Sequence, residues 1–161
     1  LINNAAIRPE KPFLDTTDAD WHRVLDVDLN AVFYGCRAAL PGMVSNNWGR
    51  IINLTGMNAI HGYSGRAPVS VAKHGVWGLT KALAKEFGPS GITVNAISPG
   101  PIRPEHDDPI QSQHLHGQVG RIPLGHLGEP YHIASLCAYL ISDGGGFVSG
   151  QMIACNGAAE T

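Results

Sequence analysis

The feature that most constrains the fold of this chain is the alternation of short, continuously apolar runs with amphipathic segments. The apolar runs are LIN at 1–3, GRIINLT at 49–55, GITVNAISPG at 91–100 and GQMIACNG at 150–157. Such runs are typical of strands that are buried on both faces, as in parallel sheets. With amphipathic helices between them, the 161 residues predict one domain, 1–161, of α/β class.

Three helices are expected between the apolar runs. The first follows Thr17, an N-cap residue type, and spans one helix or two in succession within 18–45. Its apolar stripe consists of Trp21, Val24, Leu25, Asp28, Val32, Phe33, Cys36, Leu40 and Met43. The second helix begins at Pro68, and the third spans 128–143 with an inner side of Ile133, Leu136, Cys137, Leu140 and Ile141.

Two charged residues lie on these apolar stripes. Lys73 is in line with Val69, Val76, Thr80, Leu83 and Phe87 on the second helix. Either its stem is buried while its ammonium reaches water, or its charge is used. Asp28 is in line with the stripe of the first helix, and either it is the partner of Lys73 or it faces water at a join between two helices.

The charge balance limits the kinds of partner that the protein could bind, and the cysteines indicate its compartment. Eleven basic and thirteen acidic side chains, without a basic run, argue against a nucleic-acid binder and against a membrane-surface helix, so small molecules or proteins are expected. No apolar run reaches the ~18 residues of a membrane span. Cys36, Cys137 and Cys155 are far apart and odd in number, which favours a reducing, cytoplasmic compartment over a disulfide framework or a zinc knuckle.

The carboxyl ends of the expected strands are NNAA, NLTG and SPGPI. Parallel sheets bind ligands at this edge, so these segments are expected to form a binding site, with Lys73 close to it.

The motifs INNAA, GRIINLTG, VSVAKHGVWGLTKALAKE, GITVNAISPGPI and SGQMIACNGA, in this order and spacing, resemble the C-terminal two-thirds of a short-chain dehydrogenase/reductase. The resemblance implies a doubly wound, Rossmann-like parallel sheet without its first strands. It also implies NAD or NADP as cofactor, a small alcohol or carbonyl substrate, and a homo-oligomer, dimer or tetramer, paired through helices at 18–45 and 68–88.

The resemblance also assigns cofactor contacts. Lys73 would hydrogen-bond the nicotinamide ribose, and the other positions that match the family's cofactor-binding segments are Asn4, Ala5, Pro99, Gly100 and Ile102. The family's glycine-rich phosphate loop would precede residue 1, so the chain is expected to be a fragment, with one sheet edge left unpaired. Without the residue that follows the family's second strand, NAD and NADP cannot be distinguished.

The family's proton-transfer residues are replaced here. Its tyrosine, serine and asparagine positions are occupied by Val69, Gly56 and Asp28, and only the lysine, Lys73, remains. The usual mechanism needs a proton donor and a group that polarises the carbonyl, and valine and glycine can supply neither. Tyr63 is the preferred substitute acid, ahead of His61, Ser64 and Thr55, although a loop tyrosine is more often a packing residue.

Four alternatives remain open. The protein could be a catalytically silent relative that binds a nucleotide or a partner, and the isolated chain could be inactive. SVAK, from Ser70 to Lys73, fits the pattern of a lysine-activated serine nucleophile. A polar loop contains His106, Asp107, Asp108, His114 and His116, which are metal-ligand types, but no metal is assigned because a substrate loop is ordinarily polar.

Overall fold

A computed structural model describes residues 1–104, 117 and 119–159 of the chain. Its centre is one sheet of β1 (Ile2–Asn3), β2 (Gly49–Leu54), β3 (Ile92–Pro99) and β4 (Met152–Cys155), in the order β1-β2-β3-β4. All three neighbouring pairs are parallel. The predicted α/β class and the four predicted strands are therefore confirmed.

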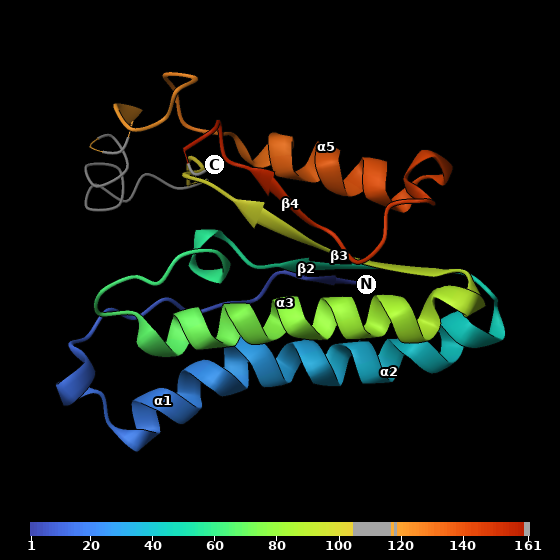
Figure 1. Ribbon diagram of the computed structural model, residues 1–161, viewed down its shortest axis with the longest axis horizontal. Coiled ribbons are helices and arrows are strands. Elements are labelled where there is room, and N and C mark those ends of the chain that lie inside the picture. The colour runs from blue at the N-terminus through green and yellow to red at the C-terminus, as the bar shows by residue number, and fades with distance from the viewer. Residues whose placement is uncertain (105–116, 118, 160–161) are drawn as a thin grey trace.

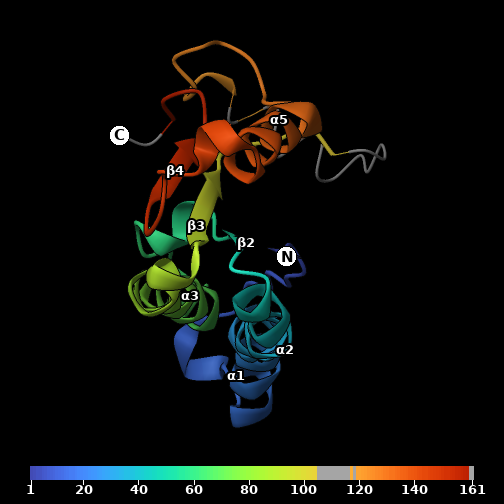
Figure 2. The same cartoon turned by 90° about the vertical axis from the view of Figure 1, so that its right-hand side faces the viewer.

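The helices lie in two layers around this sheet. Helices α2 (Ala31–Ser45) and α3 (Ala67–Phe87) lie side by side on one face, and α5 (Pro130–Ile141) covers the other (Figures 1 and 2). Helix α1 (Asp18–Leu25) continues into α2 through a π-helical turn, η2 (Asp26–Asn30). Short 3-10 turns complete the described elements: η1 (Phe13–Asp15), η3 (Met57–Ala59), η4 (Gly88–Ser90) and η5 (Asp143–Gly145).

The buried strands divide their side chains between the two layers. Ile51 and Val94 pack with α2 and α3, whereas Ile52 and Ile97 pack with Cys137 and Leu140 of α5. Successive residues of a strand point to opposite faces, so both faces of β2 and β3 have to be apolar. This two-sided burial explains why the strands are continuous apolar runs in the sequence.

The last crossover has the opposite hand to the first two. The connections through α1–α2 and through α3 pass over one face while the strand order advances in one direction. The connection through α5 advances in the same direction over the other face (Figure 2). About 98% of parallel crossovers share a single hand, so this reversal could not be expected from the pattern of elements.

Local sequence signals fix the helix starts. The Thr17 hydroxyl accepts a hydrogen bond from the Asp20 N–H, and the Asp20 carboxylate accepts one from the Thr17 N–H. This reciprocal pair is a capping box, which confirms the expected start of α1. Helix α3 begins at Ala67, one residue before the expected start, with Pro68 in its first turn, where no backbone N–H is needed.

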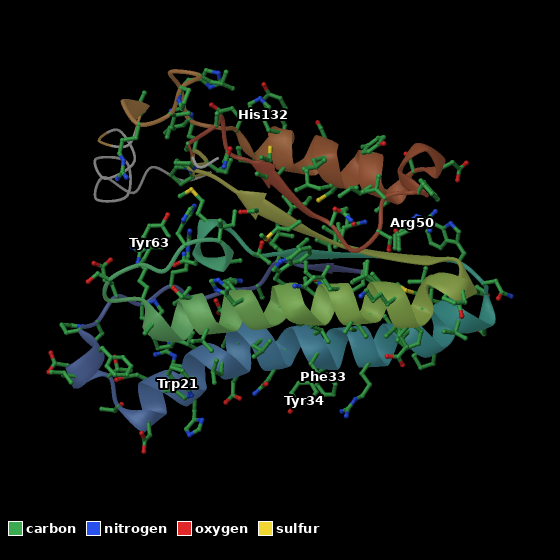
Figure 3. The ribbon with its side chains drawn as sticks, viewed as in Figure 1. Trp21, Phe33, Tyr34, Arg50, Tyr63 and His132 are labelled. Atoms are coloured by element: carbon green, nitrogen blue, oxygen red, sulfur yellow. The ribbon has the colours of Figure 1, made fainter. Side chains whose placement is uncertain are left out.

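Two predicted core positions are wrong. Phe33 is 41% exposed and projects away from the sheet (Figure 3), and Ile141, at the end of α5, is 44% exposed. Phe33 is the neighbour of Val32, which packs against the sheet, and successive helical residues are about 100° apart around the helix axis. Val32, Cys36 and Leu40 form the buried stripe of α2 instead.

The carboxyl ends of the strands lie together at one end of the molecule, where segments 4–12 and 55–66 leave the sheet (left in Figure 1). Within the described residues, β1 pairs with β2 only, so its outer edge carries no further strand. This agrees with the predicted lack of the first strands. No helix among the described residues is both long and apolar enough to cross a membrane.

Candidate functional site

The Lys73 side chain is buried beneath the carboxyl end of the sheet. The residue is 4% exposed, and its Nζ donates a hydrogen bond to the Leu54 carbonyl oxygen, 3.1 Å away, at the last residue of β2. The ammonium therefore does not reach bulk water, and the alternative of a buried stem with a hydrated head is wrong. The charge is held inside the protein.

Asp28 is the partner of this ammonium. It lies in the π-helical turn η2 and is 0% exposed, with its Oδ2 3.6 Å from Lys73 Nζ. Its Oδ1 accepts a hydrogen bond of 2.8 Å from the Ile7 N–H. The alternative in which Asp28 faces water is therefore wrong. The pair and its hydrogen bonds therefore join four parts of the chain at one point: η2, α3, the end of β2 and the segment after β1.

Burial and neighbouring charges shift the pKa of Lys73 in opposite directions. Burial, the largest effect, lowers the pKa of Lys73 below its ordinary value of 10.5, and the negative charge of Asp28 opposes this shift. The positive charge of Arg8, an exposed residue, lowers the pKa of Lys73 slightly further. Asp28 therefore favours the protonated form of Lys73 in a place where burial disfavours it.

The predicted cofactor contacts lie on the segments that follow β1 and β3. Asn4 and Ala5 follow β1 and are exposed, and Pro99 and Gly100 are partly buried at the end of β3. Ile102 forms a parallel bridge with Gly128, in which the neighbouring Pro101 carbonyl and Arg103 N–H make the hydrogen bonds. Because backbone groups alternate along an extended segment, the N–H and carbonyl of Ile102 itself point away from Gly128 and can receive a ligand.

The two positions that lack the family's proton-transfer side chains differ in their surroundings. Val69 is 0% exposed and packs in an apolar cluster with Val24 and Ala72. Gly56 has a φ of +88°, and a Cβ atom built there would meet only the Pro99 carbonyl oxygen, at 3.9 Å. Open space therefore exists beside Gly56, just after the end of β2, but neither residue brings a hydroxyl group to it.

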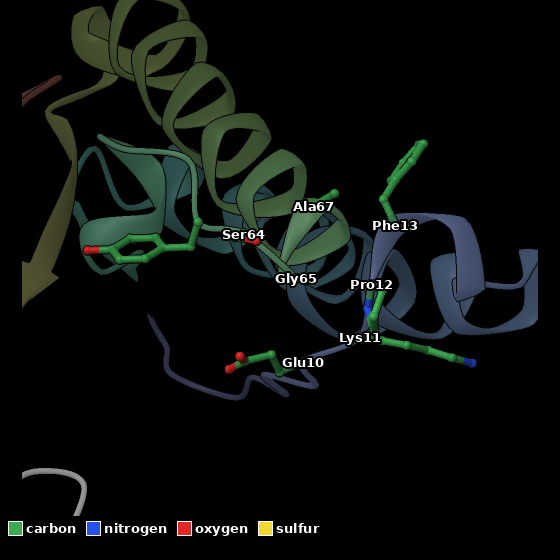
Figure 4. A pocket seen from close by; sticks show the side chains of 8 residues that line it. Glu10, Lys11, Pro12, Phe13, Ser64, Gly65 and Ala67 are labelled. Carbon is green, nitrogen blue, oxygen red and sulfur yellow. The ribbon is translucent and has the colours of Figure 1, made fainter.

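Tyr63 borders an open hollow at the end of the molecule where the strands finish (Figure 3). The hollow has a volume of about 740 Å³ and lies between segment 10–13 and the start of α3 (Figure 4); its lining residues are Glu10, Lys11, Pro12, Phe13, Tyr63, Ser64, Gly65 and Ala67. Lys73 and Asp28 do not line this hollow. The role of Tyr63 as a substitute acid stays a prediction.

The remaining candidate nucleophiles and ligands gain no support. The Ser70 hydroxyl is buried without a hydrogen-bond partner in the described part of the chain, so Lys73 is not placed to take its proton. The proposed metal ligands between 106 and 116 lie outside the described residues, and no group of three possible ligands occurs among the residues that are described. Burial raises the pKa of the Cys155 thiol, which disfavours the thiolate.

Sequence reasoning missed the backbone partners of the pair. The Leu54 carbonyl and the Ile7 N–H hold Lys73 and Asp28, respectively. A backbone group is the same in every residue, so no side-chain pattern could have identified these two. Arg8 could have been noticed, because it is a cation close after the first predicted strand.

Comparison with known proteins gives consistent matches. The family described as enoyl-(acyl carrier protein) reductase matches residues 1–158. The chain is 40% identical over 157 residues to the acetoacetyl-CoA reductase of Cupriavidus necator and 36% identical over 157 residues to the 3-oxoacyl-acyl-carrier-protein reductase of Pseudomonas aeruginosa. Each alignment covers 98% of this chain and 64% of the relative, so the chain spans less than two thirds of these proteins.

Two solved structures share the fold over nearly all of this chain. A short chain dehydrogenase from Bacillus anthracis has a TM-score of 0.88 and 35% identity, covering 99% of this chain and 63% of that one. A 4-hydroxyisoleucine dehydrogenase complexed with NADH and succinate has a TM-score of 0.88 and 34% identity, covering 98% of this chain and 66% of that one.

Proposed function

Since this chain belongs to the short-chain dehydrogenase/reductase family, we propose that it forms the nicotinamide side of an NAD(P)-dependent oxidoreductase that acts on a small alcohol or carbonyl compound. The observation that carries the proposal is the buried Lys73 ammonium at the carboxyl end of β2. An ammonium has three donors, and Lys73 directs one to Leu54 and one toward Asp28. The third is left for a ribose hydroxyl.

The residues at this edge fit the nicotinamide half of such a cofactor. The backbone groups of Ile102 face away from Gly128 and suit a carboxamide. There is open space beside Gly56, where a side chain would meet only the Pro99 carbonyl oxygen. The Ser98 hydroxyl, wholly buried on β3, has no hydrogen-bond partner in the described chain, so a polar group is still unsatisfied near this edge. When bound, the cofactor would supply or accept the hydride.

A second candidate is favoured by one specific observation. Val69 and Gly56 occupy the positions where relatives of this family carry their proton donor and their carbonyl-polarising hydroxyl, and Val69 is sealed in an apolar cluster. A protein with these residues would bind a nicotinamide nucleotide without turning over a substrate. Both candidates share the cofactor site and differ only in chemistry.

The test is a titration of the 161-residue chain with NADH and NADPH, followed by nucleotide fluorescence. Saturable binding that is weakened at least tenfold in Lys73→Met supports the cofactor site. The same chain is then assayed with a panel of small alcohols and oxidised cofactor, and of carbonyl compounds and reduced cofactor. Binding without turnover on any of them favours the silent candidate, and absence of binding by the folded chain refutes the proposal.

A further inference from the structure

The Asp28 carboxylate introduces a negative charge at a position where the family resemblance places a neutral asparagine. It is wholly buried, and the Ile7 N–H donates to its Oδ1. Its Oδ2 has no hydrogen-bond partner within the described residues and lies 3.6 Å from Lys73 Nζ. A buried charge is weakly screened, so it acts on other charges at this edge of the sheet.

Among the described residues, two positive charges act at this pair. Lys73 supplies a buried one, 3.6 Å from Asp28, and Arg8 acts on Lys73 from the surface, where water screens it. The buried part of the site is therefore neutral, because Asp28 and Lys73 cancel. With an amide at position 28, the same place would carry an uncompensated ammonium.

Oxidised and reduced nicotinamide nucleotides differ by one positive charge on the ring and carry the same phosphates. A buried uncompensated ammonium close to the ring would therefore weaken binding of the oxidised form relative to binding of the reduced form. The Asp28 carboxylate removes this bias by compensating the ammonium charge. We propose that Asp28 is a specificity-determining residue that shifts the binding preference of this site toward the oxidised nicotinamide cofactor. The inference rests on the cofactor site proposed above.

The consequence concerns the direction of the reaction. At equal concentrations of the two forms, a site with this carboxylate is loaded with the hydride acceptor more often than the same site with an asparagine. The substrate that meets it is then an alcohol. Asp28 thus favours alcohol oxidation over carbonyl reduction, in contrast to what an asparagine at this position would give.

The experiment compares dissociation constants in the 161-residue chain, in Asp28→Asn and in a matched control, Asp26→Asn. Asp26 lies on the same π-helical turn but is exposed, where it accepts a hydrogen bond from Asn30. NADH binding is followed by its fluorescence, and NAD⁺ binding by displacement of NADH, at the same pH for all three chains. NADPH and NADP⁺ form a second pair with the same ring charges.

The measured quantity is the dissociation constant of the oxidised form divided by that of the reduced form. In Asp28→Asn this ratio is expected to rise on the order of tenfold, because one buried unit charge is removed. For a two-electron couple, tenfold corresponds to a shift of about 30 mV in the midpoint potential of the bound cofactor. In Asp26→Asn the ratio should stay within twofold, because solvent screens that carboxylate.

The outcomes separate this inference from the proposed function. If the unsubstituted chain binds neither nucleotide form, the cofactor site and this inference both fail. If it binds both forms and the ratio is unchanged in a folded Asp28→Asn, this inference fails and the cofactor site stands. Far-UV circular dichroism checks the fold of each variant, and Asp28→Ser, a smaller neutral acceptor for the Ile7 N–H, gives the same test if the amide does not fold.

Discussion

Replacing Asp28 with asparagine should destabilise the fold substantially, because it breaks a buried ion pair while leaving the ammonium in place. The two charges are 3.6 Å apart, so at an effective dielectric constant of about 20 their attraction is about 4 to 5 kcal/mol. Removing one partner of a buried pair costs about 3 to 5 kcal/mol. The amide oxygen can still accept from the Ile7 N–H, and Lys73 keeps the Leu54 carbonyl, so we expect a loss near the lower end, about 3 kcal/mol.

Urea denaturation at pH 7, followed by circular dichroism, measures this loss. With a denaturant slope of about 2 kcal/mol per molar, the midpoint should fall by about 1.5 M. Asp26→Asn, on the exposed side of the same turn, should shift the midpoint by less than about 0.3 M, since an exposed charge contributes little. The control shows that the effect comes from the buried pair and not from net charge.

A double-substitution cycle tests the reasoning more directly. Lys73→Met alone leaves the Asp28 carboxylate buried and unpaired, and it should cost about as much as Asp28→Asn. Combining the two substitutions removes both charges, so the loss should be clearly smaller than the sum of the single losses. Additive losses, or a midpoint unchanged in Asp28→Asn, would refute the claim that the two groups stabilise each other.

Four further results are expected. Gly56→Ser should lower the free energy of unfolding by about 1 to 2 kcal/mol, because φ at this position is +88°. Gly62→Ser, at a position with open space and no left-handed φ, should leave it nearly unchanged in the same urea assay. Equal losses in the two variants would contradict this. The pKa of Lys73 is lower in the folded chain than its ordinary value of 10.5, so the unfolded chain binds more protons in the pH range between the two pKa values. The free energy of unfolding should therefore rise with pH in this range. The rise should vanish in Lys73→Met, and its persistence there would count against a role of this lysine. Thr17→Ala should cost about 1 kcal/mol in thermal or urea unfolding by removing the capping box, and no loss would show that the cap is dispensable. Tyr63→Phe should leave the dissociation constant of NADH within twofold, because Tyr63 lines the hollow between segment 10–13 and the start of α3, which Lys73 does not line; tenfold weaker binding would place it in the cofactor site.

The sequence was most informative where one physical demand dominates. Continuous apolar runs identified β2 and β3 because these strands are buried on both faces. Lys73 and Asp28 were identified because each puts a charge on an apolar stripe, and a buried charge needs a partner. These inferences depend on local pattern alone.

Features that depend on three-dimensional geometry could not be predicted in this way. The π-helical turn at Asp26–Asn30 leaves no distinctive residue pattern. Which of the neighbours Val32 and Phe33 packs against the sheet depends on the rotation of α2 about its axis, and Phe33 was assigned to the wrong side. The reversed crossover through α5 depends on which face of the sheet remains to be covered, which is a property of the whole fold.

The π-helical turn also sets a rotational phase between the two halves of the long helical segment. A π turn holds one residue more than an α turn, which amounts to about 100° of helix rotation. Deleting Val27 to make the segment continuously α-helical would keep the four-residue spacing between Asp28 and Val32, but it would rotate Val24 of α1 by about 100° relative to them. The length of this turn therefore couples the packing of α1 to the placement of the carboxylate: after a one-residue deletion, Asp28 could stay beside Lys73 only if Val24 turned away from Val69 and Ala72.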